Sequence, residues 1–296
     1  RTYDRATSSV DHVPVANVDG DWLESLAAPK RFAGFGFADG PVLMGIVNVT
    51  PDSFSDGGRF LDHDRAIRHG FELAEAGAGI IDVGGESTRP GAAAVSIDEE
   101  VARIEPVVRR LASEGLCVSI DTRNAEVMRA ALQAGAAIIN DVTALTHDPD
   151  ALPLAAGSDA SVMLMHMQGE PGTMQEAPDY EFAPADVCDH LEARRNACLD
   201  AGIPLERISL DPGIGFGKND THNYQILDWL GLYQGLGCAL TLGVSRKSFI
   251  GRTDGGADAD ARVPGSLASA LAGVRRGAQI LRVHDVAETR QALAVW

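Results

Sequence analysis

Eight short apolar runs recur along the chain and constrain its fold more than any other feature. The runs are continuous rather than alternating, which is typical of parallel strands buried on both faces. They cover residues 42–47, 80–83, 116–120, 137–139, 161–165, 207–210, 239–244 and 278–283. Between them lie stretches with helical periodicity, including 186–201, 264–277 and one that begins with the capping-box sequence Ser96-Ile97-Asp98-Glu99. Eight strand–helix repeats predict a closed (β/α)₈ barrel or a doubly wound open sheet.

Polar or charged residues stand at the carboxyl end of nearly every run. In chain order they are Asn48, Asp82, Asp121, Asn140 with Asp141, His166, Asp211, Ser245-Arg246-Lys247, and Arg282 with His284. In a barrel all eight carboxyl ends open on one face, where the active site is built. An open sheet would concentrate such residues at one switch point. We therefore predict an α/β fold, a single (β/α)₈ TIM barrel with its site at the strand carboxyl ends.

The first 40 residues differ from the rest. They have little periodicity and mix Asp, Pro, Gly and Ser with a patch formed by Phe32, Phe35 and Phe37. We interpret residues 1–40 as an N-terminal extension, either partly disordered or forming a short hairpin that closes the bottom of the barrel. The barrel is expected over residues 41–296, a length that suits one domain of this kind.

Charge and cysteine usage exclude several classes of partner. The formal net charge is -17, whereas binding to nucleic acid needs clustered Lys and Arg, so we expect no nucleic-acid partner. No apolar run approaches the roughly 20 residues of a membrane helix, and residues 1–30 contain no signal-peptide core. The cysteines form no CxxC pair and are interpreted as buried free thiols. We therefore expect a cytoplasmic protein without a membrane partner.

Two long loops follow the first two runs. The first, residues 48–58, is either an Asx/Pro turn leading into a helix or a mobile lid, with the Asn48 side-chain oxygen offered to a hard cation. The second, residues 82–91, combines a glycine-opened turn with two hydroxyls and Arg89. Backbone N–H groups, hydroxyls and a guanidinium together are suited to a diphosphate.

Asp121, Asn140 and Asp211 follow three different runs and are candidates for recognising a flat heterocycle. A 2-amino-4-oxo pyrimidine has adjacent N–H donors, and one carboxylate can accept both hydrogen bonds. A cage for a divalent metal is an alternative, because Asp and Asn oxygens also suit Mg²⁺ or Mn²⁺. Another is that these residues cap the helices that follow.

Basic residues gather after the last two runs, in Ser245-Arg246-Lys247-Ser248 and around Arg282 and His284. Phosphate sites in barrels often lie at the seventh and eighth strands, although a solvated charged face would also explain the pattern. The segment 211–219 superficially resembles a P-loop, but its spacing is one residue short and Asn219 replaces the Ser or Thr that would bind Mg²⁺. We interpret it as a glycine-hinged loop that presents Phe216 to an aromatic ligand, and His166 as a hydrogen-bonded packing residue.

Taken together, these segments resemble the dihydropteroate synthase family. The matching stretches are MGIVNVTPDSFSDGG at 44–58, DVGGESTRPGA at 82–92, SIDT at 119–122, IINDV at 138–142, MLMHMQG at 163–169, LDPGIGFGK at 210–218, VSRKSFIG at 244–251 and LRVHDV at 281–286. Eight motifs in the family's order leave little room for another assignment. The resemblance implies a pterin-binding barrel that joins (7,8-dihydropterin-6-yl)methyl diphosphate to 4-aminobenzoate, giving 7,8-dihydropteroate and pyrophosphate for folate.

The resemblance also implies residue roles. The pterin diphosphate would be bound by residues from five strand tips and the second loop, namely Thr88, Asp121, Asn140, Asp211, Lys247, Arg282 and His284. The aminobenzoate would lie among Phe54, Thr88, Pro90, Phe216, Lys247 and Ser248. The catalytic set would be Arg89, Lys247, Arg282 and His284, with Asn48 as the ligand of an Mg²⁺ cofactor. A homodimer and ordinary sulfonamide sensitivity are further expectations from the family.

Two other functions would share part of this pattern. A pterin-dependent methyltransferase barrel would explain Asp121, Asn140 and Asp211 but not the first two loops or the basic residues suited to a diphosphate. A degenerate paralogue would bind pterin without turnover, although no motif is visibly broken. Methyl transfer to cobalamin would identify the methyltransferase, and pterin binding without turnover would identify the degenerate paralogue.

Overall fold

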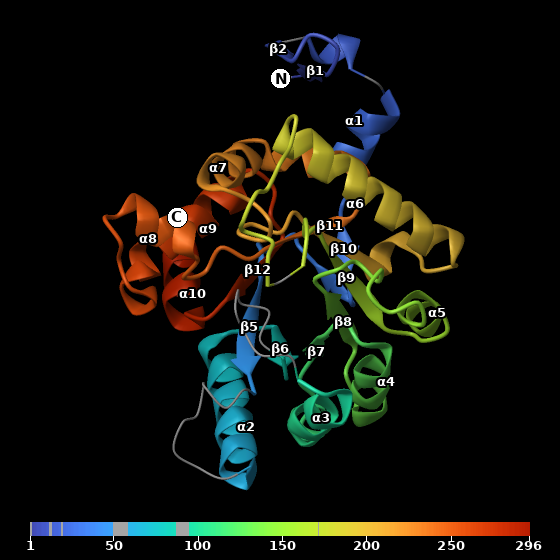
Figure 1. Ribbon diagram of the computed structural model, residues 1–296, viewed down its shortest axis with the longest axis vertical. Coiled ribbons are helices and arrows are strands. Elements are labelled where there is room, and N and C mark those ends of the chain that lie inside the picture. Colours follow the sequence, from blue (N-terminus) through green and yellow to red (C-terminus); the bar gives the residue numbers. More distant parts are fainter. Residues whose placement is uncertain (1, 12–13, 19, 50–58, 87–94, 171) are drawn as a thin grey trace.

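Eight parallel strands close into a barrel in chain order (Figure 1). The computed structural model describes residues 2–296 except 12–13, 19, 50–58, 87–94 and 171. The strands are β5 (Val42–Asn48), β6 (Ile80–Gly84), β7 (Val118–Asp121), β8 (Ile138–Asp141), β9 (Ser161–Met165), β10 (Ile208–Asp211), β11 (Ala239–Leu242) and β12 (Ile280–Val283). The last strand pairs with the first, with Leu281 opposite Leu43, and this closure confirms the predicted barrel and excludes the open sheet.

Helices surround the barrel and connect its strands. They are α2 (Arg59–Ala76), α3 (Ile97–Ser113), α4 (Ala125–Ala134), α5 (Ala151–Ala156), α6 (Ala183–Asp200), α7 (Asp220–Asp228), α9 (Val263–Arg275) and α10 (Val286–Val295), with a short α8 (Ser248–Thr253) after β11. Ser96 caps α3 as expected, because its side chain accepts a hydrogen bond of 3.3 Å from the Glu99 amide. Helix α6 starts three residues before the predicted position, with Pro184 in its first turn.

The strands carry apolar side chains on both faces, which explains their continuous apolar runs. Outward-facing residues such as Val83, Ile120 and Leu164 pack with the helices in the main core. A second cluster lies inside the barrel and contains Met44, Ile80, Ile138, Met163, Ala239 and Ile280 from the strands, joined by Phe32 from the N-terminal segment. Burial of both faces is what holds a parallel sheet in place.

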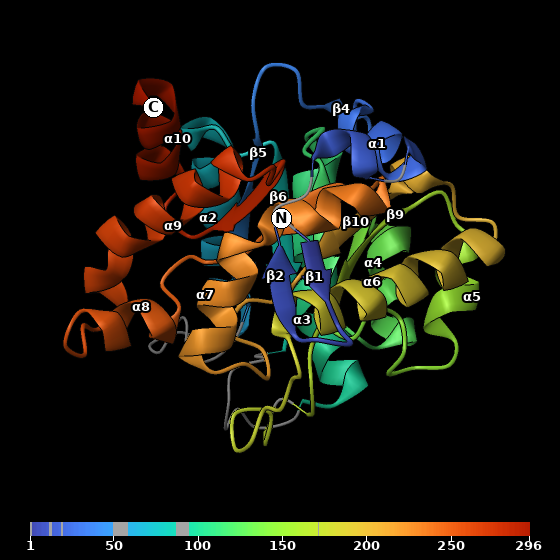
Figure 2. The same cartoon turned by 90° about the horizontal axis from the view of Figure 1, so that it is seen from above.

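The N-terminal segment forms two small hairpins and a helix. Strands β1 (Thr2–Asp4) and β2 (Ser9–Asp11) form the first hairpin, α1 (Gly20–Ala27) follows, and β3 (Arg31–Phe32) pairs with β4 (Phe35–Gly36). The first hairpin lies outside the barrel beside α6 (Figures 1 and 2), where Arg5 hydrogen-bonds Asp186 at 2.8 Å. The second places Phe32, which is fully buried, among residues near the amino ends of the strands.

The four cysteines form no disulfide, and burial raises the pKa of each thiol. Such thiols stay protonated and unreactive at neutral pH. Across the described residues, the helices are too short or too polar to traverse a bilayer.

Candidate active site

Three predicted site residues converge at the carboxyl ends of β10, β11 and β12. Gly243 follows β11, and a Cβ placed on it would lie 3.8 Å from Asp211 Oδ2, 3.8 Å from Lys247 Nζ and 3.9 Å from Arg282 Cβ. The three side chains therefore surround one point at the mouth of the barrel. Closure of the barrel brings them together, because they are separated by up to 71 residues in sequence, from Asp211 to Arg282.

Arg282 links this point to the other side of the mouth. Its Nε donates a hydrogen bond of 2.6 Å to Asp82 Oδ2, and one of its terminal nitrogens donates a bond of 2.6 Å to Asp121 Oδ2. Asn140 Nδ2 also donates to Asp82 Oδ2, at 3.1 Å. A planar guanidinium with several fixed N–H donors can join two carboxylates in this way.

Asp82 is one of the polar residues that mark the ends of the apolar runs, and the sequence predicts no further role for it. The structure shows it fully buried between Arg282 and Asn140, with its Oδ1 lacking a hydrogen-bond partner among the described residues. Its position therefore orients two predicted pterin-binding side chains. The available signal is a carboxylate within the second apolar run. In the structure Asp82 lies in the middle of β6, opposite Ser119 of β7, whereas Gly84 at the end of β6 pairs with Asp121.

The charges in this cluster are not balanced. Three carboxylates, from Asp82, Asp121 and Asp211, share the positive charges of Arg282 and Lys247. Burial raises the pKa of Asp121 to about 7, although Arg282 opposes this change, and burial also raises the pKa of Asp211. Burial lowers the pKa of Lys247 to about 8. Arg282 stays charged, because Asp82 and Asp121 outweigh the effect of burial on its pKa.

The same geometry weakens the alternative of a divalent-metal cage. Arg282 already lies between Asp82 and Asp121, so a second cation there would be repelled by the guanidinium. Among the described residues, no group of three or more His, Cys, Asp or Glu could hold a metal ion. Asn140 hydrogen-bonds Asp82 instead of capping the helix that follows it.

A glycine-hinged loop presents Phe216 to the mouth. Gly213, Gly215 and Gly217 have φ values of 67°, 83° and 59°, in the left-handed region that favours glycine. Lys247 Nζ lies 4.7 Å from the centre of the Phe216 ring and donates a hydrogen bond to the Ile214 carbonyl. Asn219 caps α7 in a capping box, so the segment is not a phosphate-binding P-loop.

The basic residues after β11 do not all face the site. Lys247 does, but Arg246 has a φ of 56° and its guanidinium hydrogen-bonds Asp285 and Asp260. Arg246 therefore lies beside the segment that follows β12, and the carboxylates of Asp285 and Asp260 compensate its charge. Ser248 is exposed at the start of α8.

His284 lies next to this region. Its Nδ1 is 3.0 Å from Ser245 Oγ, and its backbone amide donates to the same oxygen at 3.1 Å. The tip of β12 therefore carries both Arg282 and His284.

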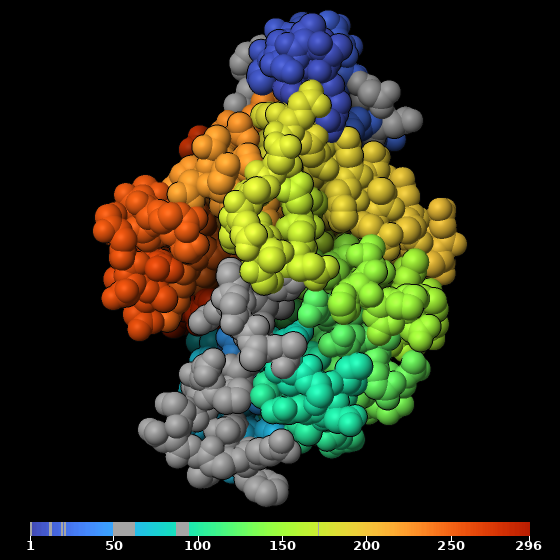
Figure 3. All heavy atoms as spheres, in the orientation of Figure 1, coloured from blue at the N-terminus to red at the C-terminus, as the bar shows by residue number. Residues whose placement is uncertain are grey.

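The remaining predicted residues fall into two groups. Asn48 is half-buried at the end of β5, paired with Gly84 of β6. Phe54, Thr88, Arg89 and Pro90 lie outside the described residues. A loop of residues 166–182, described except at residue 171, connects β9 to α6 and forms a yellow-green ridge below the first hairpin on the face seen in Figure 3.

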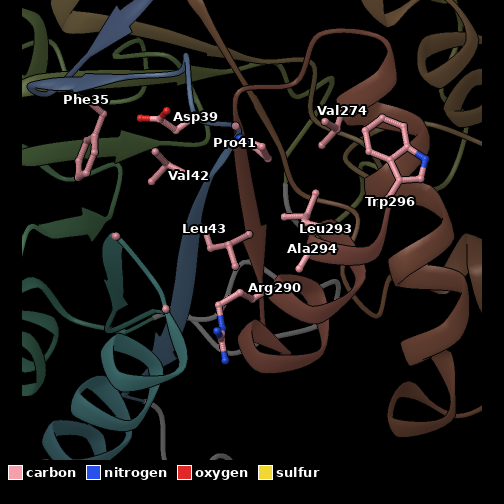
Figure 4. Close-up of a pocket in the computed structure, with 13 residues that line it drawn as sticks. Phe35, Asp39, Pro41, Val42, Leu43, Val274, Arg290, Leu293, Ala294 and Trp296 are labelled. Carbon is pink, nitrogen blue, oxygen red and sulfur yellow. The ribbon is translucent and has the colours of Figure 1, made fainter.

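A separate pocket lies at the opposite end of the barrel. It has a volume of about 580 Å³ and includes Val42 and Leu43 at the amino end of β5, together with Phe35, Arg290 and Trp296 (Figure 4). None of the predicted site residues lines it.

Comparison with known proteins identifies the family. Residues 44–284 match the family model described as pterin binding enzyme. The dihydropteroate synthase of Neisseria meningitidis serogroup B is 50% identical over 263 residues, which cover 87% of this chain and 92% of that protein.

Solved structures support the same family. The Xanthomonas albilineans dihydropteroate synthase with 4-aminobenzoic acid has a TM-score of 0.84 and 47% identity, covering 91% of this chain and 97% of that one. The same enzyme in complex with 7,8-dihydropteroate has a TM-score of 0.79 and 46% identity, covering 86% and 92%. The barrel with a buried carboxylate, guanidinium and amine cluster at its mouth therefore belongs to the pterin-binding enzyme family, as one of its dihydropteroate synthases.

Proposed function

We propose that this chain condenses (7,8-dihydropterin-6-yl)methyl diphosphate with 4-aminobenzoate, giving 7,8-dihydropteroate and pyrophosphate. The observation that carries the proposal is the cluster of Asp211, Lys247 and Arg282 around one point of the barrel mouth. It offers hydrogen-bond acceptors for a flat ring and cations for an anionic leaving group at the same place. The X. albilineans relative was solved with 4-aminobenzoic acid and with 7,8-dihydropteroate, and these ligands match the two ends of the proposed reaction.

The pterin ring would bind deepest in the mouth. Asp121, Asn140, Asp211 and Lys247 would hydrogen-bond it, and Arg282 would stack on its face. Support comes from burial, since Asn140 and Asp211 are each only 7% exposed and a ring bound there would be shielded from water. In a site of low polarity, each hydrogen bond to the ring is stronger than it would be in water.

The diphosphate would lie toward β12 and the first two loops. Arg282 and His284 from the tip of β12 would contact it, with Thr88 and Arg89 from the second loop. Asn48 offers one neutral oxygen, which suits Mg²⁺ bound mainly through diphosphate oxygens and water rather than by a protein cage. When bound, Mg²⁺ would neutralise charge on the diphosphate.

The aminobenzoate would occupy the outer part of the mouth. Phe216 and Lys247 lie together there, and a ring beside Phe216 with its carboxylate near Ser248 is consistent with that placement. Phe54, Thr88 and Pro90 would complete the pocket from the two long loops.

The reaction needs little proton transfer at the start, because an aryl amine is neutral at pH 7 and its lone pair is available. The bond between the pterin methylene and the diphosphate oxygen breaks, and its electron pair leaves with pyrophosphate. The amine nitrogen then forms the new C–N bond and releases one proton. Arg89, Lys247, Arg282 and His284 would stabilise the charge that develops on the leaving group, and closure of the long loops would exclude water.

The direct test measures pyrophosphate release from the pterin-methyl diphosphate, with and without 4-aminobenzoate and Mg²⁺. Release that requires all three, with formation of 7,8-dihydropteroate, is the expected result. Binding of the pterin without release would identify a degenerate paralogue. Methyl transfer from a methylated folate to cobalamin would identify the methyltransferase alternative.

We also propose a cytoplasmic location and a homodimer. The four free thiols, two of them buried and two partly buried, support a reducing compartment, and the family resemblance supports the dimer. Light scattering of the purified protein would measure the oligomeric state.

A further inference from the structure

A fully buried lysine lies beneath Phe216 and has no part in the reaction proposed above. Lys218 lies near the end of the glycine-hinged loop and is only 1% exposed. Its amine contacts a histidine and two carbonyls, and no ion pair with a carboxylate is found among the described residues. Burying an amine costs free energy unless hydrogen bonds offset the loss of water, whereas Met or Leu would fill the same space without that cost.

The contacts of the Lys218 amine are complete. Its Nζ lies 2.8 Å from His166 Nδ1, 3.3 Å from the His166 carbonyl oxygen and 2.9 Å from the Phe216 carbonyl oxygen. A lysine amine has three hydrogen-bonding positions, and all three are used. The pKa of His166 is lowered to about 2, mainly by burial and further by the nearby Lys218 and His190. The His166 ring therefore stays neutral and does not repel the Lys218 amine.

Side chains hold the middle of the loop that carries Phe216, at residues 214–217. Four successive carbonyl groups each accept a side-chain hydrogen bond. The pairs are Ile214 with Lys247, Gly215 with Gln175, Phe216 with Lys218, and Gly217 with Tyr180. A segment without regular structure is thereby fixed in one conformation, because each carbonyl has a partner at a defined position.

The 166–182 loop and the glycine-hinged loop also meet backbone to backbone. A Cβ on Gly213 would lie 1.9 Å from the His166 carbonyl oxygen, and one on Gly217 would lie 2.2 Å from the Gln168 carbonyl oxygen. Only glycine permits such an approach. Lys218 bonds to both loops at their base, through His166 in one and Phe216 in the other.

We propose that Lys218, together with His166, is a positioning residue for the aminobenzoate pocket. It joins the 166–182 loop to the glycine-hinged loop and thereby holds Phe216 against Lys247. The inference rests on the proposed function, which assigns Phe216 to the aminobenzoate. Lys218 acts through Phe216 and does not touch either substrate.

The test is Lys218→Met, which keeps the length of the side chain and removes its hydrogen bonds. We expect the KM for 4-aminobenzoate to rise about tenfold, while kcat at saturation and the KM for the pterin diphosphate change by less than about threefold. A displaced Phe216 weakens only the second substrate, whereas general damage to the barrel would affect all three constants. The matched control is Lys30→Met at the bottom of the barrel, where the lysine is also buried and bonds the Ser25 carbonyl. In this control, kcat and both KM values should stay within about twofold of those of the parent protein.

A second variant keeps the proposal testable if Lys218→Met does not fold. Tyr180→Phe removes one hydrogen bond to the same loop and keeps the ring, so we expect a rise of about threefold in the KM for 4-aminobenzoate alone. A folded variant of either kind with an unchanged KM for 4-aminobenzoate, or with equal rises in both KM values, would overturn the inference. If the parent protein itself releases no pyrophosphate in response to 4-aminobenzoate, the proposed function fails instead.

Discussion

Replacing Arg282 by Met should destabilise the fold as well as abolish turnover. The guanidinium bonds Asp82 and Asp121 at 2.6 Å each, and Asp82 is fully buried. Breaking a buried pair by removing one partner typically costs about 3–5 kcal/mol, because the remaining charge is left uncompensated. Two carboxylates lose their partner here, but the Asp121 side chain is 13% exposed and is partly solvated. We therefore expect the free energy of unfolding to fall by about 4 kcal/mol.

The loss of stability in Arg282→Met should become smaller as the pH falls. Burial already raises the pKa of Asp121 to about 7 although Arg282 opposes this rise, so without Arg282 the penalty on its carboxylate is present above that pH. The penalty disappears as the pH falls toward the value near 4 of an unfolded Asp. Lowering the pH from 7.5 to 5.5 should recover at most about 2.7 kcal/mol for each proton that the folded variant binds, and the folded parent does not bind, throughout this range.

The free energy of unfolding of the variant and the parent can be measured at pH 7.5 and 5.5 by urea titration, with tryptophan fluorescence as the signal. Arg252→Met is the matched control, since Arg252 pairs with Asp220 at the surface, with side-chain exposures of 52% and 38%. It should cost less than about 1 kcal/mol. Adding Asp82→Asn and Asp121→Asn to the Arg282 variant should restore stability without restoring turnover. A stability of Arg282→Met within 1 kcal/mol of the parent at pH 7.5 would refute the argument.

Three further outcomes follow from the site. Because the pKa of Lys247 is lowered to about 8, its charge is lost as the pH rises through that value, so kcat/KM should fall above pH 8, and Lys247→Arg should move this decline upward in a pH–rate profile. Chelation of Mg²⁺ should suppress pyrophosphate release but leave the thermal unfolding midpoint unchanged, because the described residues form no metal cage; a clear drop in Tm would contradict this. Sulfonamides should compete with 4-aminobenzoate, and Phe216→Ala should weaken both by roughly tenfold, as measured by inhibition constants and KM.

The barrel was predictable from local patterns. Each apolar run became a strand within about two residues, and the run over 207–210 appears as Ile208–Asp211. Parallel strands buried on both faces must be apolar throughout, and the capping sequence at Ser96 sets a helix start through contacts within one turn. The polar residues at the strand ends then identified the mouth, because barrel closure places all the carboxyl ends on one side.

Local patterns do not predict how neighbouring polar residues divide their tasks. Arg246 and Lys247 are adjacent and alike in charge, yet Arg246 has a positive φ and pairs with Asp260 and Asp285, whereas Lys247 lies with Asp211 at the mouth. Asp82 and Lys218 acquire their roles from partners 200 and 52 residues away, Arg282 and His166. Periodicity and caps report contacts within a few residues, whereas the partner of a buried charge is set by how distant strands and loops meet.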